Sequence, residues 1–211
     1  MKVIIVSGGK PPKEQTLRSY LNNESYIISA DSGANTLHKY SIVPNIILGD
    51  FDSIHSNVLN HFQKVGCKTI SYPAEKNFTD TEAAIEEAIK LNPQEILLFG
   101  CTGSRLDHTL ANLGLLYKCL NNSIKARIID ENNVISLHHK DFEIKGRRGE
   151  LFSLQAFGHV VNNLSILKAK YELYNYDLKF GDPRTVSNEL LDDTVSITFK
   201  SGLLILIRSK D

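Results

Sequence analysis

The sequence has few cysteines and no long apolar run. Cys67, Cys101 and Cys119 are the three cysteines among 211 residues, and no two of them form a CxxC pair. An odd number of scattered cysteines argues against a disulfide framework or a zinc site and is typical of a reducing compartment. No stretch is long enough to span a bilayer, and the apolar residues 3–6 are too few for the core of a signal peptide. We therefore expect a cytoplasmic protein with no membrane partner.

Charge of one sign is not in excess either. Lys and Arg together number 24, as do Asp and Glu. A balanced chain has no general basic field that would attract nucleic acid, so we expect no nucleic-acid partner. Recognition of a phosphate group would have to come from a local site.

The first part of the chain alternates strand-like apolar runs with segments of helical spacing. This alternation predicts an α/β domain with a Rossmann-like, mainly parallel sheet whose two faces are covered by helices. The expected strands are residues 3–6, 26–30, 46–48, 68–71, 95–99 and 126–129. The expected helices are residues 14–21, 34–40, 56–65, 79–91 and 106–120.

The pattern changes after about residue 132. Short apolar runs are separated by glycine-containing turns, and no long helical pattern follows. This pattern of short apolar runs and turns predicts a small all-β, sandwich-like domain. We therefore expect one domain over residues 1–131 and a second over 132–211. The apolar runs of the second part are residues 134–137, 151–157, 160–167, 195–199 and 203–207. The pair His138–His139 is expected to be solvated.

Four polar clusters each follow an expected strand of the first domain. In an open α/β sheet, ligands bind beyond the carboxyl ends of the strands, so this shared placement predicts a binding site. Each cluster alone has a local explanation: Asp31 or Asp52 could cap a following helix, and Thr79 with Glu82 fits a capping box. The clusters are residues 30–35, 49–53, 76–82 and 100–108.

The carboxylates of these clusters would repel one another at a single rim of the sheet. Like charges a few ångströms apart repel by several kcal/mol at intermediate dielectric. A magnesium ion bridging carboxylates and phosphates would remove this repulsion, because it prefers oxygen ligands. The sequence thus predicts a magnesium-dependent enzyme acting on a nucleoside triphosphate. The carboxylates are Asp31, Asp50, Asp52, Asp80 and Asp107.

The last cluster also offers an anion site. Gly100 and Gly103 allow close approach of the backbone, and the helix that opens near Arg105 directs free N–H groups towards a phosphate. Arg105 adds a permanently charged fork that suits phosphate oxygens. The spacing matches neither GxxxxGK[ST] nor GxGxxG.

Taken in order, these motifs resemble thiamine pyrophosphokinases. The resemblance rests on ADSGAN, GDFDS, the TD pair and GxxGxRxDH, followed by the late sequence Val186–Glu189, and it covers nearly the whole chain. It implies transfer of the β,γ-diphosphoryl group of ATP to the primary hydroxyl of thiamine, which gives thiamine diphosphate and AMP. Two alternatives stay open. One is a diphosphokinase for another hydroxymethyl heterocycle such as a pterin, and the other is a non-catalytic sensor of nucleotide or thiamine.

The resemblance also assigns residues. It implies that Asp50, Asp52 and Asp80 hold Mg²⁺ on the triphosphate and that Lys76 approaches the reacting phosphates. Asn77 stands where the family is expected to have an acidic residue. ATP would be bound by the set Asp31, Gly100, Gly103, Arg105 and Asp107.

For thiamine, the resemblance assigns Ser187 and Asn188 of the second domain. Tyr171 is a candidate to stack on the substrate ring, although a strand-surface or core aromatic fits the sequence equally well. His108 could be a general base, but its position just inside a helix suits packing or hydrogen bonding as well. The family also implies a homodimer in which each active site combines the first domain of one subunit with the second domain of the other.

Overall fold

The chain begins with six parallel strands that alternate with five helices. We describe residues 1–210 in a computed structural model, which divides into the units Met1–Glu131 and Asn132–Asp211. The strands and helices of the first unit follow the order expected from the sequence. They are β1 (Lys2–Val6), α1 (Glu14–Tyr20), β2 (Ser25–Ala30), α2 (Gly33–Lys39), β3 (Ile46–Gly49), α3 (Ser56–Lys64), β4 (Lys68–Ser71), α4 (Asp80–Ile89), β5 (Glu95–Phe99), α5 (Leu106–Asn121) and β6 (Lys125–Ile129).

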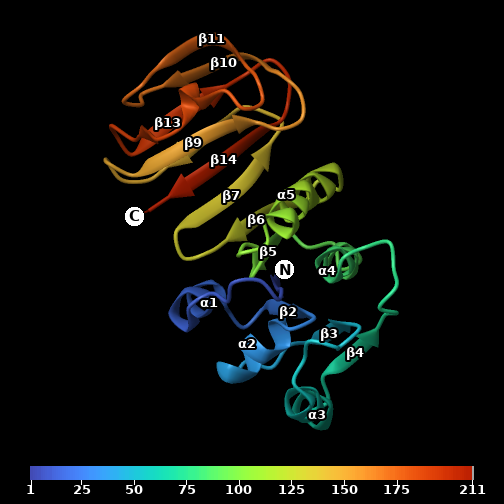
Figure 1. Ribbon diagram of the computed structural model, residues 1–211. Helices are drawn as coiled ribbons and strands as arrows, with labels where there is room; N and C mark the ends of the chain where they lie inside the picture. The colour runs from blue at the N-terminus through green and yellow to red at the C-terminus, as the bar shows by residue number, and fades with distance from the viewer. Residues whose placement is uncertain (211) are drawn as a thin grey trace. The chain divides into compact units, whose positions relative to one another are not determined.

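Parallel pairing places the strands of the first unit in the order β6-β5-β1-β2-β3-β4. Figure 1 shows α1, α2 and α3 on one side of this sheet and α4 and α5 on the other. Strands covered on both faces read as continuous apolar runs, and residues 3–6, 46–48 and 96–99 are all buried. The strand order reverses between β1 and β5, which is where such a sheet opens a ligand-binding crevice.

The second unit is a sandwich of two antiparallel sheets, in the orders β12-β9-β14-β7 and β11-β10-β13-β8. Along its central strands β9 and β13, buried and partly buried positions alternate, as expected for sheets with one face on the core. Phe152 and Leu154 from one sheet and Ile166 and Ile197 from the other share a single hydrophobic cluster. Its elements are β7 (Asn133–His138), β8 (Phe142–Lys145), β9 (Leu151–Ala156), β10 (Val161–Leu167), β11 (Leu173–Leu178), the 3₁₀ turn η1 (Pro183–Thr185), β12 (Asn188–Glu189), β13 (Thr194–Thr198) and β14 (Leu204–Ser209).

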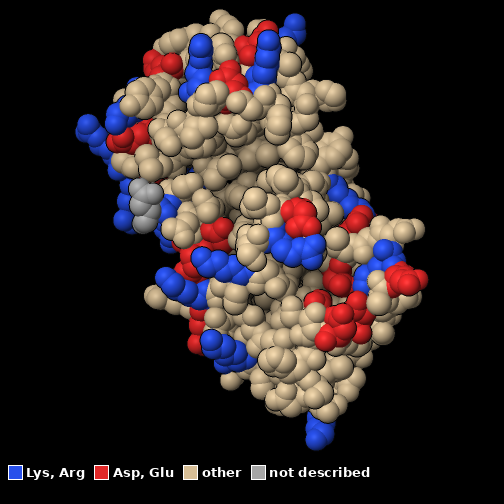
Figure 2. Space-filling view, in the orientation of Figure 1, with Lys and Arg blue, Asp and Glu red and all other residues tan. Residues whose placement is uncertain are grey.

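The predicted fold class is therefore confirmed: a mainly parallel α/β unit is followed by an antiparallel β unit. Acidic and basic side chains alternate over the face visible in Figure 2, in keeping with the balanced composition. Among the described residues, no helix has the length and apolar character needed to cross a membrane.

The expectation that His138 and His139 are both solvated is wrong for His138. The His138 ring stacks on Phe142, with ring centroids 3.8 Å apart, and its Nε2 lies 2.8 Å from Ser136 Oγ. Burial, with a smaller contribution from His139, lowers the pKa of His138 to about 4. Two adjacent histidines suggested a solvated pair, but His138 is the last residue of β7 and packs on Phe142, whereas His139 lies beyond the end of the strand. His139 is the exposed member.

This burial makes stability depend on pH. Because the folded protein holds His138 neutral, protonation favours the unfolded chain, whose histidines titrate near 6.5. The free energy of unfolding is unaffected by His138 above pH 6.5, and it falls as the pH decreases from 6.5 towards 4. From pH 7 to pH 5, wild type should therefore lose about 2 kcal/mol through this group, as measured by urea unfolding at both pH values. His138→Phe should remove this loss of stability between pH 7 and pH 5, and His139→Gln should keep it. An equal loss in all three proteins would contradict a buried, neutral His138.

Candidate active site

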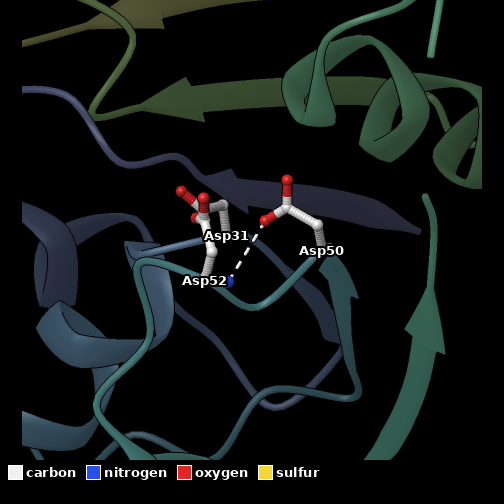
Figure 3. A group of neighbouring side chains, drawn as sticks. All are labelled: Asp31, Asp50 and Asp52. Atoms are coloured by element: carbon white, nitrogen blue, oxygen red, sulfur yellow. Dashed lines mark hydrogen bonds between the residues drawn. The ribbon is translucent and has the colours of Figure 1, made fainter. Parts of the chain in front are cut away.

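Three of the predicted carboxylates lie together beyond the ends of β2 and β3. Asp31 follows β2, and Asp50 and Asp52 follow β3; one carboxylate oxygen of each lies within 4.8 Å of the others (Figure 3). The Asp52 N–H donates to Asp50 Oδ1 over 3.2 Å, and this bond shapes the loop between them. The adjacent, parallel strands bring together residues that are about twenty positions apart in the sequence.

The backbone of these two loops is held in unusual conformations. Asp31 and Phe51 have φ values of +49° and +68°, in the left-handed region that few non-glycine residues adopt. The Asp31 N–H donates to the Leu48 carbonyl over 2.8 Å, which ties the first loop to β3. Such strained residues gather where a functional arrangement requires them.

Helix capping does not explain these carboxylates. Helix α2 has Ser32 as its N-cap and α3 has His55, and neither cap residue makes a side-chain capping bond. Only the third proposed cap is present: Thr79 Oγ1 accepts a hydrogen bond from the Glu82 N–H. That cap is not a complete capping box, because the Glu82 carboxylate pairs with Lys118 at 3.0 Å. Asp31 and Asp52 are therefore free for another role.

The grouping of carboxylates alters the titration of Asp31. Burial raises the pKa of Asp31, and the nearby charges of Asp80, Asp50 and Asp52 raise it further against a hydrogen bond from the Ser32 backbone. One oxygen, Asp31 Oδ1, is buried without a hydrogen-bond partner in residues 1–210. A cation brought to this place would relieve both the repulsion and the unsatisfied oxygen.

Asp80 and Lys76 form the other part of the acidic site. Lys76 Nζ lies 2.9 Å from Asp80 Oδ1 and 3.8 Å from Asp50 Oδ2, and the lysine side chain is only 8 % exposed. Asp80 begins α4, so its charge also interacts favourably with the positive end of that helix. The structure thus brings four predicted carboxylates and Lys76 to one rim.

The glycine-containing turn after β5 lies against the loop after β1, at the point where the strand order reverses. The Gly9 N–H donates to the Gly100 carbonyl over 2.8 Å, and the Lys10 N–H donates to the Thr102 carbonyl over 2.7 Å. A Cβ at Gly9 or Gly100 would come closer than 3.0 Å to a carbonyl oxygen of the opposite loop. The two backbones can approach this closely only because both positions are glycine.

The loop over residues 7–10 was not among the predicted motifs. The signal was present, since two glycines and a lysine follow the first buried strand, but the sequence suggested only a strand end. Ser7 is buried, and its hydroxyl lies 3.0 Å from Thr81 Oγ1. Asn112, also missed, is buried in α5 and donates to the Cys101 carbonyl over 2.8 Å. These bonds fix the two loops to α4 and α5.

Arg105 and Asp107 lie at the start of α5, as predicted. Both side chains are exposed and form an ion pair with each other at 2.7 Å. The hydrogen bond from Arg105 lowers the pKa of Asp107 to about 2 and raises that of Arg105. Arg105 stands at the N-cap of this 16-residue helix without a side-chain capping bond, and the Asp107 carboxylate accepts a hydrogen bond from the His108 N–H in the first turn. His108 is exposed in the first turn of this helix.

A cavity of about 1130 Å³ joins these features within the first unit. Seven of the predicted residues line it, together with the Ser7–Lys10 loop. Asp52 and Asp107 are not part of its lining, although each neighbours a residue that is. The predicted residues in the lining are Asp31, Asp50, Lys76, Asp80, Gly100, Gly103 and Arg105.

The three residues predicted for thiamine lie in the second unit. Tyr171 is 59 % exposed, whereas Asn188 is 3 % exposed. Asn188 Oδ1 accepts from the Tyr171 N–H over 3.0 Å and Asn188 Nδ2 donates to the Tyr171 carbonyl over 2.8 Å, so this side chain holds the Tyr171 backbone. Ser187 is exposed at a φ of +57°, and its N–H donates to Ser153 Oγ. The three residues therefore form one local cluster, and exposure makes a core role for Tyr171 wrong.

Comparison with known proteins identifies the family. Residues 17–128 match the family model "Thiamin pyrophosphokinase, catalytic domain", and residues 139–204 match "Thiamin pyrophosphokinase, vitamin B1 binding domain". The chain is 35 % identical to the thiamine pyrophosphokinase of Bacillus subtilis, with 100 % of both chains covered. The crystal structure of the Bacillus subtilis protein superposes with a TM-score of 0.91 at 31 % identity, covering 100 % of both chains. That of the Geobacillus thermodenitrificans protein superposes with a TM-score of 0.88 at 31 % identity, covering 100 % of this chain and 98 % of the other. This chain belongs to the thiamine pyrophosphokinase family.

Proposed function

We propose that this protein transfers a diphosphoryl group from ATP to the hydroxyl of thiamine, producing thiamine diphosphate and AMP. The single observation that carries the proposal is the full-length similarity, which includes a vitamin B1-binding region over residues 139–204. That region favours thiamine over a pterin as the acceptor. A catalytic role also suits the retained carboxylates better than a sensor role does, because a sensor has no need for a cluster that repels itself.

ATP is the co-substrate of this reaction, and we propose that its phosphates bind where β1 and β5 end. Gly100 and Gly103 let the backbone approach a phosphate, and the N-terminus of α5 directs the positive end of the helix dipole towards it. Arg105 contributes a fixed positive charge at the cavity wall. Asp107 forms an ion pair with Arg105 at 2.7 Å, and Asp31 lines the same cavity.

We further propose that Asp50, Asp52 and Asp80 hold Mg²⁺. Asp50 and Asp52 group with Asp31 rather than with Asp80, and this group fits a hard cation because its donors are carboxylate oxygens and one buried oxygen of Asp31 has no hydrogen-bond partner among the described residues. When bound, Mg²⁺ would neutralise negative charge on the reacting phosphates. Lys76 and Arg105 add positive charge from the protein itself, and the rigid loops orient the triphosphate for in-line attack.

For thiamine, we propose that the cluster of Tyr171, Ser187 and Asn188 contributes the binding surface. Tyr171 offers an exposed aromatic face to a ring of the substrate. Ser187 offers an exposed hydroxyl, while Asn188 positions the Tyr171 backbone from inside the fold. Thiamine carries a permanent positive charge on its thiazolium ring, which the acidic rim of the first unit would also attract.

The identity of the products tests the proposed reaction. With ATP, Mg²⁺ and thiamine, we expect the nucleotide product to be AMP and the acceptor to carry two phosphates. Nucleotides are separated by chromatography, and the thiamine product is identified by its mass. ADP together with thiamine monophosphate would contradict a diphosphoryl transfer, and AMP formation with a pterin alone would contradict thiamine as the acceptor.

We also propose a homodimer with composite active sites, located in the cytoplasm. The location is supported by Cys67, Cys101 and Cys119, all of which are free.

For the dimer, Asp80→Ala and Asn188→Ala should each give an almost inactive enzyme, because each damages a different half of every site. Refolding the two variants together should restore part of the AMP formation, since a mixed dimer contains one undamaged site. No recovery in demonstrated mixed dimers would mean that each chain builds its own complete site.

A further inference from the structure

Lys76 carries a buried ammonium group that has an ion-pair partner but no hydrogen bond. Its side chain is 8 % exposed, and Nζ lies 2.9 Å from Asp80 Oδ1. Within residues 1–210, neither Lys76 Nζ nor Asp80 Oδ1 has a partner in hydrogen-bond geometry. An ammonium group has three N–H donors, and leaving them unsatisfied in a buried place is costly. The lysine is therefore held by charge alone and could bind a better acceptor.

The surroundings of Lys76 indicate what that acceptor is. The side chain lines the cavity that also contains the turn over residues 100–103 and Arg105. Beside it lie Asp50, with Oδ2 at 3.8 Å from Nζ, and the Phe78 ring, whose centroid is 6.0 Å away. Phosphate oxygens in this cavity would supply the hydrogen bonds that the carboxylates do not, and bonds between charged groups are the strong ones.

The position of Lys76 also conflicts with a metal ion. Asp50 and Asp80 are two of the three residues proposed to hold Mg²⁺, and both already lie next to the ammonium group. Two cations cannot take the same carboxylate oxygens without strong mutual repulsion. Either the ammonium group stays between Asp50 and Asp80, or it moves and exposes them to a divalent cation.

We propose that Lys76 competes with the divalent cation for Asp50 and Asp80 until phosphate oxygens draw its ammonium group away. This inference rests on the proposed function, because it takes the metal and triphosphate from there. In the nucleotide-free protein Lys76 compensates the carboxylates and weakens metal binding. A bound triphosphate attracts Lys76 and frees the carboxylates. Metal and nucleotide thus favour each other's binding, as linkage requires.

The first test measures Mn²⁺ binding to nucleotide-free protein by isothermal titration calorimetry and by the electron paramagnetic resonance signal of free Mn²⁺. Lys76→Met removes the competing charge and keeps most of the side-chain volume, so its affinity for Mn²⁺ should rise about tenfold or more. Lys76→Arg keeps a cation and should stay close to wild type. Lys10→Met is the matched control, because Lys10 lines the same cavity but forms no ion pair with any residue in 1–210; its Mn²⁺ affinity should change less than about twofold.

The second test measures the binding of α,β-methylene ATP in the presence of EDTA. Lys76→Met should bind this analogue about tenfold more weakly than wild type, and Lys76→Arg should recover most of the loss. Unchanged or weaker Mn²⁺ binding by Lys76→Met would overturn the proposal, and so would unchanged nucleotide binding. If Lys76→Met and Lys76→Gln both failed to fold, Lys76 would be a cation that the fold requires, which overturns the proposal as well.

These experiments can be separated from the test of the proposed function. Neither titration contains thiamine, so neither depends on the identity of the acceptor. If wild-type protein formed no AMP with ATP, Mg²⁺ and thiamine, the proposed reaction would fall while the titrations kept their meaning. If AMP formed but Lys76→Met bound Mn²⁺ no better than wild type, the proposed competition between Lys76 and the metal would be contradicted, and the proposed reaction would be supported.

Discussion

Asp50→Asn and Asp52→Asn should each lower the rate of AMP formation about a hundredfold or more, because each removes a negatively charged ligand that would hold the metal ion, whose positive charge would neutralise the reacting phosphates. The fold should tolerate both changes. Asp52 is exposed and its carboxylate accepts one hydrogen bond from its neighbour Ser53. Asp50 lies among other carboxylates; Lys76 keeps its nearer partner Asp80, and Asn at position 50 keeps an oxygen for the Asp52 N–H. The melting temperature of the metal-free protein should therefore stay unchanged or rise slightly.

The control for this prediction is Glu75→Gln. It removes one negative charge close to the same rim, but Glu75 is exposed and does not line the cavity. Its rate should stay within about twofold of wild type, since a solvent-exposed charge that does not face the cavity is screened by water and salt. The measurements are initial rates of AMP formation at saturating Mg²⁺ and thermal unfolding without metal. If Asp50→Asn and Asp52→Asn kept their turnover and melted at lower temperature, these carboxylates would serve the fold and not the reaction.

The parallel sheet could be predicted because its strands are buried on both faces. β1, β3 and β5 leave almost no polar position, so their apolar runs stand out from the helices between them. The polar clusters after β2, β3, β4 and β5 were then found without any knowledge of strand order, whereas the loop after β1 was missed. A polar cluster that directly succeeds a buried parallel strand can thus be recognised in a single sequence.

Edge strands of the second unit were not predicted for the opposite reason. β11 lies at the edge of its sheet, and most of its positions are at least partly exposed, so no apolar run marks it. Asn175, inside this strand, has a φ of +49°, and the pairing with β10 shifts register. β8 has one fully buried residue, Ile144. A half-exposed edge strand carries too few buried side chains to be recognised from hydrophobicity.

Contacts between loops that are distant in the sequence could not be predicted either. The role of Gly9 depends on β1 and β5 being neighbours, although they are more than ninety residues apart in the chain. The ion pair of Lys76 with Asp80 depends on a loop that turns back before α4 begins. Residue types and strand ends locate a site, whereas the partner of each side chain is decided by the packing of loops.

Gly100→Ala should give the second large effect, on stability as well as activity. Gly100 has a φ of +65°, and a Cβ there would overlap the carbonyl oxygen of Ser7. Forcing a non-glycine residue into the left-handed region costs about 1 kcal/mol, and a clash with backbone adds about 1–3 kcal/mol. We therefore expect the free energy of unfolding to fall by about 3 kcal/mol. AMP formation should fall as well, because the loops after β1 and β5 would have to separate.

Gly66→Ala separates the two causes. Gly66 lies in the same unit at a φ of +83°, and a Cβ added there meets no atom within 4 Å. It should lose only about 1 kcal/mol from backbone conformation and keep its activity. Urea unfolding and initial rates of both variants are the measurements. A similar loss of stability in Gly100→Ala and Gly66→Ala would mean that the loops after β1 and β5 can move apart and accommodate an added methyl group. A larger loss in Gly100→Ala, accompanied by weaker nucleotide binding, would show that close packing of the two loops maintains the phosphate-binding end of the cavity.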